Sequence, residues 1–246
     1  TANWKDSTIP TVSIARTDYN TFSWTASDNV GIAGYAITNS STAPTSWTTS
    51  GTLTSGTKDV TAAGTYYVWV KDAAGNTASA NIAAYTLTKT QGTGTSLTIV
   101  ENVTSGATLN SGAIVLNGTS IKLTATANTG YSDLTVKVGG SVVTLASNSY
   151  TFTMNGNKAV ESSATIVNYS ITYNLKGGSV ATANPTSYNV ESATFTLNNP
   201  TKTGYTFAGW TGSKGTTPQT AVTITKGSTG NKSYTANWTI NAFTVT

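Results

Sequence analysis

The sequence predicts an all-β chain composed of several small modules in series. Apolar and polar residues alternate at a period of two along most of the chain, and a helical period is almost absent. Turns rich in Gly, Asn and Ser separate these stretches at the spacing typical of sandwiches and other small β folds. About one residue in five is threonine, whose branched side chain suits a half-exposed pleated surface.

The composition favours an extracellular protein and excludes several classes. Charged residues make up 9% of the 246 residues, well below the roughly 25% of ordinary soluble domains. The 13 Lys and Arg residues stand singly, so the net charge of +4 forms no basic patch for nucleic-acid binding. No stretch is apolar enough for direct membrane insertion, and without cysteine no disulfide can hold a module together.

An internal repeat indicates a tandem array. The run Thr-Ala-Asn-Trp at residues 1–4 recurs at residues 235–238, and each copy ends a strand pattern with an aromatic residue. We interpret residues 1–4 as the tail of an upstream repeat and residues 240–246 as the start of the next module. Segments of such arrays are usually spacers, stalks or adhesive surfaces.

The first predicted module spans residues 5–90. Residues 6–10 are expected to form a leading linker, because Pro10 restricts its neighbour to extended geometry. The run at 64–68 is similar to the tyrosine-corner pattern of immunoglobulin domains, with Tyr66 at the corner and Val68 where the second cysteine would stand. The module therefore resembles a bacterial immunoglobulin-like surface domain, although the Asp before the Gly and the disulfide are both missing.

The second predicted module spans residues 91–167 and follows a linker, expected to be flexible, at residues 92–94. Two Gly-containing dipeptides, at 139–140 and 155–156, are strong hairpin signals. The runs that begin at Gly118, Gly130 and Tyr150 resemble a divergent B-type repeat of bacterial surface proteins.

The third predicted module spans residues 168–239. Residues 200–210 read Pro-x-Lys-x-Gly-Tyr-x-Phe-x-Gly-Trp, and the module closes on the aromatic residues Tyr234 and Trp238. This segment resembles the Listeria–Bacteroides repeat, also called the internalin-type B-repeat. The resemblance implies a small β-grasp-like fold that occurs in tandem on bacterial surface proteins, and it supplies no ligand.

The signature of the third module also has a direct physical interpretation. Gly204 is expected at φ > 0 in a turn just before a strand. Strict alternation then places Tyr205, Phe207 and Gly209 on one face and Trp210 on the other. Two large rings on one face would supply core area, and Gly209 would leave room for a close backbone.

The chain is expected not to be an enzyme. It has neither histidine nor cysteine, which excludes His-based nucleophilic catalysis and metal sites built from those residues. The 9 Asp and Glu residues would suffice for a glycosidase pair, but they are widely spaced and most stand in turns.

Calcium is the one metal for which the sequence offers candidate ligands. Asp28 follows one predicted strand, and Asp72 with Asn76 follows another, so hard oxygen ligands would converge at one end of a sandwich. The alternative is turn chemistry, since Asp72 also suits the start of a turn that contains Gly75.

The second module also offers candidate residues for an intramolecular Lys–Asn isopeptide cross-link. Lys122 and Lys137 lie within apolar strands, and Glu101 or Glu161 would serve as the promoting acid. Lys122 alternates out of phase with its apolar neighbours, however, so its side chain is expected to point to water.

Exposed aromatic rings are the candidates for ligand binding. Trp47 lies between predicted strands, and Trp69 and Tyr67 face away from the apolar side of their strand. Such rings can stack on sugars, and the alternative is that they cover the edge of another sheet.

Together these features predict a stalk or adhesin segment of a secreted, wall-attached protein of a Gram-positive bacterium, which projects or repeatedly presents binding surfaces. It is expected to act as a monomeric part of a longer array, without cofactors other than calcium. The alternatives are a module that binds host glycans, matrix proteins or cell-wall polymers, and an accessory domain of a large extracellular enzyme.

Overall fold

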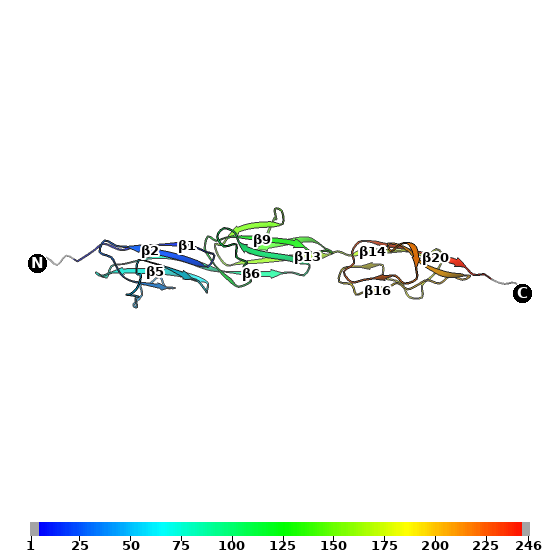
Figure 1. Ribbon diagram of the computed structural model, residues 1–246, viewed down its shortest axis with the longest axis horizontal. Helices are drawn as coiled ribbons and strands as arrows, with labels where there is room; N and C mark the ends of the chain where they lie inside the picture. The colour runs from blue at the N-terminus through cyan, green and yellow to red at the C-terminus, as the bar shows by residue number, and fades with distance from the viewer. Residues whose placement is uncertain (1–4, 243–246) are drawn as a thin grey trace. The chain divides into compact units, whose positions relative to one another are not determined.

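The computed structural model describes residues 5–242, and every regular element in this range is a β-strand (Figure 1). The predicted all-β class is therefore confirmed. No helix of the described chain has the length and apolar character needed to cross a membrane. The proposed upstream tail at residues 1–4, and the last four residues of the proposed next module, lie outside the described range.

The strands are β1 (Thr11–Arg16), β2 (Thr21–Ser27), β3 (Ile32–Thr38), β4 (Ser55–Asp59), β5 (Gly64–Asp72), β6 (Thr77–Gln91), β7 (Thr95–Glu101), β8 (Ala113–Leu116), β9 (Ser120–Ala127), β10 (Tyr131–Val138), β11 (Ser141–Val143), β12 (Ser149–Thr153), β13 (Lys158–Ile166), β14 (Tyr169–Asn174), β15 (Ser187–Tyr188), β16 (Phe195–Thr196), β17 (Tyr205–Gly212), β18 (Gly215–Gln219), β19 (Thr223–Ile224) and β20 (Lys232–Ile240).

The chain divides into two compact units. Unit 1 contains residues up to Thr126 and the segment Thr135–Ser163, and unit 2 contains Ala127–Leu134 and the residues from Ala164 onward. Strands β10 and β13 thus have residues in both units.

The N-terminal part of unit 1 is a two-sheet sandwich. One sheet has the order β1-β2-β4, and the other contains β3, β5 and β6 side by side, which is the arrangement expected of an immunoglobulin-like fold. Phe22 and Trp24 from β2 pack against Val68 and Val70 from β5 in one apolar core. The Tyr66 hydroxyl donates to a backbone carbonyl four residues upstream at 2.9 Å, as a tyrosine corner requires.

The predicted flexible linker at residues 92–94 is wrong. Strand β6 continues to Gln91, and the next three residues form a tight turn into β7. The Gly92 N–H donates to the Ser162 carbonyl at 2.9 Å, and a Cβ on Gly92 would lie 2.4 Å from that oxygen. The first half of β6 pairs with β5, and its second half pairs with β8 and β13. One continuous strand therefore belongs to both the sandwich and the following module.

The two parts of unit 1 also share a core. Leu116 of β8 is fully buried in the sandwich cluster, and Ile114 packs against the same cluster. The Leu116 N–H donates to the Tyr19 carbonyl at 2.7 Å, and the next N–H donates to the Ala83 carbonyl at 2.8 Å. These contacts join the first two predicted modules into one folded body.

The second module and unit 2 repeat one topology. The order β8-β6-β13-β10-β11 in the first case matches β15-β14-β20-β17-β18 in the second. In both, the first and last long strands are parallel neighbours, namely β6 with β13 and β14 with β20. The intervening chain forms a second, smaller sheet, β12-β9-β7 or β16-β19. Central parallel strands with antiparallel partners on both sides are consistent with the predicted β-grasp-like arrangement.

Strict alternation in β17 is interrupted by a β-bulge. Phe207 lies opposite Trp238, but Gly209 lies opposite Asn237, so Ala208 is the extra residue. As a result Phe207 and Trp210 face the same core, with ring centroids 5.4 Å apart, whereas Tyr205 is exposed. The predicted face of Trp210 was therefore wrong. Tyr205 shares a face with Phe207 as predicted, because the register is regular before the bulge, but its ring is exposed and adds little to the core.

Gly209 makes this bulge possible. It has φ of 130°, and a Cβ there would lie 2.5 Å from the Gln219 amide nitrogen of β18. The backbones of β17 and β18 thus approach too closely for any side chain, as the sequence suggested.

Glu101 closes the loop that follows β7. Its carboxylate is 1% exposed and accepts hydrogen bonds from the N–H groups of Val103, Thr104, Ser105 and Gly106 at 2.7–3.2 Å. Burial raises the pKa of the carboxyl, but these bonds outweigh it and hold the pKa below its ordinary value near 4.5.

These contacts give Glu101 a local role other than promotion of a cross-link. Lys122, Lys137 and Glu161 are all exposed, and the Lys122 side chain lies on the solvent face of β9 as its alternation indicates.

We expect Glu101→Gln to destabilise unit 1 at pH 7 by about 1–3 kcal/mol, because the amide replaces one charged acceptor oxygen by a donor. A carboxyl with a lowered pKa contributes stability above its unfolded pKa and loses it as the pH falls through the folded pKa. The difference between wild type and variant in urea unfolding should therefore shrink from pH 7 to pH 3. An equal difference at both values would contradict this role.

Candidate metal centre

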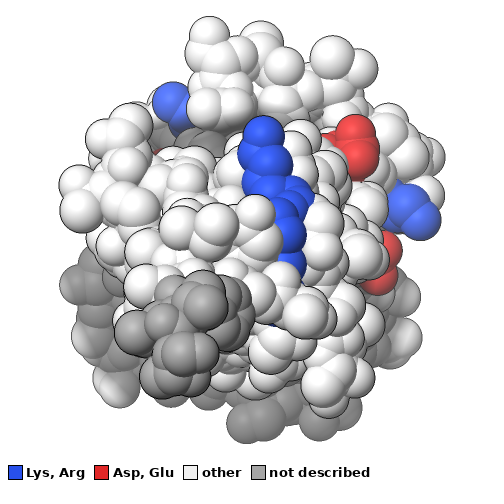
Figure 2. All heavy atoms as spheres, turned by 90° about the vertical axis from the view of Figure 1, so that its right-hand side faces the viewer, with Lys and Arg blue, Asp and Glu red and all other residues white. Residues whose placement is uncertain are grey.

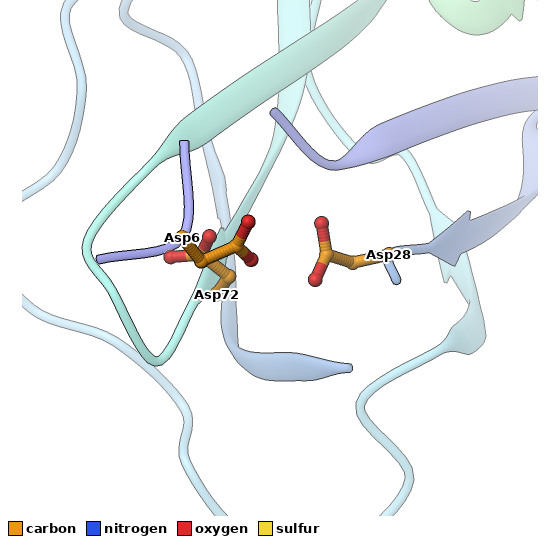
Figure 3. A group of neighbouring side chains, drawn as sticks. All are labelled: Asp6, Asp28 and Asp72. Atoms are coloured by element: carbon orange, nitrogen blue, oxygen red, sulfur yellow. The ribbon is translucent and has the colours of Figure 1, made fainter. Parts of the chain in front are cut away.

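Three carboxylates from separate segments converge at one end of the sandwich (Figure 3). Asp6 precedes β1, Asp28 follows β2, and Asp72 is the last residue of β5. Because β1 and β2 are antiparallel, the start of one lies beside the end of the other. The β5–β6 hairpin reaches the same place, since Asn76 Nδ2 donates to the Asp6 carbonyl at 3.1 Å.

Asp72 is held by its own hairpin loop. The side chain is 2% exposed, and its two oxygens accept from the Asn76 backbone N–H at 2.8 Å and from Asn76 Nδ2 at 2.6 Å. Burial raises the pKa of this carboxyl, but the hydrogen bonds from Asn76, Gly75 and Ala74 outweigh it and hold the pKa below the ordinary value near 3.8. Asp72 is therefore a carboxylate at neutral pH.

Asp6 and Asp28 each use one oxygen locally and leave the other free. Asp6 Oδ1 accepts from the Thr8 N–H at 3.0 Å, and Asp28 Oδ2 accepts from the Val30 and Gly31 N–H groups at 3.0 and 3.2 Å. The second oxygens, Asp6 Oδ2 and Asp28 Oδ1, are shielded from solvent, and no donor within residues 5–242 reaches them. Buried acceptors without a partner are costly, which favours a ligand at this position.

The spacing of the carboxylates fits one calcium ion. One oxygen from each of the three lies within 4.8 Å of the others. Oxygens on opposite sides of a Ca²⁺ ion, each at 2.3–2.6 Å, would be about 4.6–5.2 Å apart. Hard oxygen ligands and an irregular arrangement suit Ca²⁺ better than Mg²⁺, which requires a near-ideal octahedron.

The structure changes the predicted ligand set in two ways. It brings Asp28 and Asp72 together, and it shows the Asn76 side chain donating through Nδ2 to Asp72, which orients that carboxylate. It adds Asp6, which the sequence analysis assigned to a linker. The local sequence carried no signal for this placement, because Asp6 joins the cluster through the register of β1 against β2 and the hydrogen bond from Asn76.

The three aromatic candidates lie in the same sandwich. Tyr67 and Trp69 are half-buried and alternate outward on β5 with Lys71. Trp47 is also half-buried, and the Lys71 ammonium stands 5.0 Å from its ring centroid. Trp69 Nε1 donates to the Ser40 carbonyl at 3.2 Å, which fixes the indole against the loop after β3.

Charged side chains are sparse on the surface as well as in the sequence. On the face shown in Figure 2, Lys, Arg, Asp and Glu occupy a small part of a largely uncharged surface. Exposed hydroxyl pairs across strands replace them in places: Ser13 bonds to Thr25, and Thr196 bonds to Thr223, each at 2.9 Å.

Comparisons with family models show which repeat family each of the two modules of shared topology matches. Residues 169–242 match the model of the Listeria-Bacteroides repeat domain, and residues 85–165 match that of the divergent InlB B-repeat domain. The chain carries two B-type repeats. Repeat domains of this kind are typical of bacterial surface proteins. The first B-repeat begins within β6, after the sandwich, so neither family model covers the sandwich, whose strand order is consistent with an immunoglobulin-like fold. No curated protein and no solved structure matches the chain.

Proposed function

We propose that the chain is a non-catalytic, load-bearing segment of a bacterial cell-surface protein, of the stalk or adhesin kind. The observation that carries the proposal is the parallel pairing of the first and last strands in both B-repeats. In the second repeat, β14 lies beside β20 with Ile171 opposite Lys232 and Asn174 opposite Thr235.

This geometry determines how tension acts on a repeat. The chain begins the second repeat at Tyr169 and leaves it at Ile240, which are at opposite ends of the paired strands. A pull along the chain therefore slides β14 against β20 and loads their hydrogen bonds together. A pull that opened the pair from one end would break those bonds one at a time and require less force.

The remaining connections of unit 1 suit the same role. Strand β6 runs without interruption from the sandwich into the first B-repeat, where it pairs in parallel with β13 from Leu87 to Gln91. Tension that reaches the sandwich is thus transmitted through one strand and a shared core. Such a segment would hold a distal binding part away from the cell, or present weak binding surfaces repeatedly.

Calcium has a specific place in this proposal. The three carboxylates tie the segment before β1 to the loops after β2 and β5, so a bound Ca²⁺ would fasten the start of the sandwich. Loss of the ion would free this segment without unfolding the core, which is formed by other residues.

Pulling directions provide the test of load bearing. The chain has no cysteine, so two engineered cysteines define the points of attachment. Ser170→Cys with Ile240→Cys applies shear to β14 and β20, whereas Ser170→Cys with Ser233→Cys opens them from one end. We expect a several-fold higher unfolding force for the shear pair in single-molecule measurements. Equal forces in the two directions would refute the proposal.

Calcium binding is tested separately by thermal and chemical unfolding. At a free Ca²⁺ concentration of about 100 times Kd, unit 1 should gain about 2.7 kcal/mol of stability. Asp28→Asn should abolish this gain, because it removes a charge while an amide oxygen still caps the Val30 N–H. Glu161→Gln, an exposed acid of the same unit, is the matched control and should retain the full gain. A gain that survives Asp28→Asn would exclude this site.

The outer face of β5 supports a second candidate function, binding of glycans or host proteins. Trp69 lies between Ala36 of β3 and Ser79 of β6, two small residues, and its ring is half-buried. Rings of this kind provide flat stacking surfaces.

For this candidate, Trp69→Ala should abolish, and Trp47→Ala should weaken, any saturable binding found in a screen of host glycans, matrix proteins and wall polymers. Tyr85→Phe serves as a control that leaves the outer face of β5 unchanged. Binding that is equal in wild type and both Trp variants would assign the contact to another surface.

A further inference from the structure

Two turns in the chain are equivalent in sequence, position and hydrogen bonding. Thr-Gly-Tyr occurs at residues 129–131, between β9 and β10, and again at 203–205, between β16 and β17. In each turn the Tyr N–H donates to the carbonyl three residues earlier, at 3.0 and 3.1 Å. The central residues, Gly130 and Gly204, have φ of 83° and 78°.

The last strand of each repeat closes on its turn in the same way. The residue after β13 donates its N–H to the Gly130 carbonyl at 2.9 Å, and the residue after β20 donates to the Gly204 carbonyl at 3.0 Å. Each turn therefore lies where the chain leaves its repeat. The two turns share this closing hydrogen bond but differ in what covers them.

The first turn is covered by a loop of the next repeat, within unit 2. Gly130 is buried, and a Cβ placed on it would lie 2.1 Å from Val190 Cγ1. The Tyr131 hydroxyl donates to the Glu191 carboxylate. This hydrogen bond is the main cause that raises the pKa of Tyr131, with smaller effects from burial and from the charge of Glu191.

The covering loop, residues 189–192, is rigidly built. Asn189 Oδ1 accepts from the N–H groups of Glu191 and Ser192, both at 3.1 Å. The Val190 carbonyl accepts from the Gly227 N–H at 3.0 Å. Val190 and Glu191 are thus presented in fixed positions, one as an apolar knob and the other as an acceptor.

The second turn is open among the described residues. A Cβ on Gly204 would meet nothing within 4 Å, and Tyr205 and Ile240 are 37% and 71% exposed. A groove of about 460 Å³ runs beside it, lined partly by Tyr205, Phe207 and Trp238. Lys202, which replaces Asn128 of the first turn, stands 4.2 Å from the Tyr205 ring centroid.

We propose that the turn at residues 202–205 is a docking site for the 189–192 loop of another Listeria-Bacteroides repeat. The valine of that loop would cover Gly204, and its glutamate would accept from the Tyr205 hydroxyl. The Lys202 ammonium adds a charge complementary to this glutamate, which the first turn lacks. The inference goes beyond load bearing and holds whatever force the repeats resist.

A fusion protein tests the proposal. Residues 1–240 are followed directly by a second copy of residues 167–246, so the Ile240–Val167 junction reproduces the Ile166–Val167 junction of the chain. Tyr131→Phe in the unfused chain gives the reference shift in the unfolding midpoint, because it removes the corresponding hydroxyl from the covered turn.

The expected result depends on context. In the unfused chain, Tyr205→Phe should leave the midpoint of unfolding unchanged. In the fusion, the same substitution in the first copy, at the junction, should lower that midpoint as much as Tyr131→Phe does in the unfused chain. Glu191→Gln in the appended copy should produce the same shift, and combining it with Tyr205→Phe should add little. Amide exchange at residues 203–206 should slow in the fusion relative to the chain.

Two results would overturn the proposal. One is an identical effect of Tyr205→Phe with and without the appended repeat, accompanied by unchanged amide exchange. The other is protection of residues 203–206 by an anionic wall polysaccharide but not by the appended repeat, which would assign the groove to a glycan.

Discussion

The parallel pairing of the first and last strands determines the architecture of each B-repeat. Parallel neighbours cannot be joined by a tight turn, so the chain between them must cross to a second layer and return. In the second repeat this crossing supplies β16 and β19, which form the small sheet, and between them in sequence β17, which joins β20 from the other side. The core ring of Trp210 and the bulge at Ala208 both follow from that return. The antiparallel pairing of β17 with β20 then brings the end of β20 beside the turn at Gly204.

Local patterns made much of this fold predictable from the sequence. The tyrosine corner at Tyr66 and the turn at Gly204 depend on a few adjacent residues, and both have the expected geometry. The faces of β17 did not follow from alternation, because the bulge depends on the distance between β17 and β18 at Gly209. The linker at residues 92–94 was misjudged for a similar reason, since Gly92 is constrained by Ser162, which is distant in sequence.

The residues of the candidate metal centre also differ in whether local sequence could predict their proximity. Asp72 and Asn76 are four residues apart and form one hairpin loop, so their proximity was visible in the sequence. Asp28 could be placed near them from the expected strand ends. Asp6 could not, because only the register of β1 against β2 and the bond from Asn76 bring it into the cluster. Residues that precede a first strand appear as linkers until that strand has been placed.

A glycine in a turn can contribute both to the backbone conformation of the turn and to its contact with another segment, because it has no side chain. At Gly130 a positive φ already favours glycine for conformational reasons, and the absent Cβ also leaves the space that Val190 occupies. A residue chosen for backbone geometry therefore produces a flat site at the point where the chain leaves the repeat. Gly204 satisfies the same backbone requirement and leaves the same flat site. Since the closing hydrogen bond and the turn geometry are common to both repeats, the fold itself generates a docking position each time it is repeated.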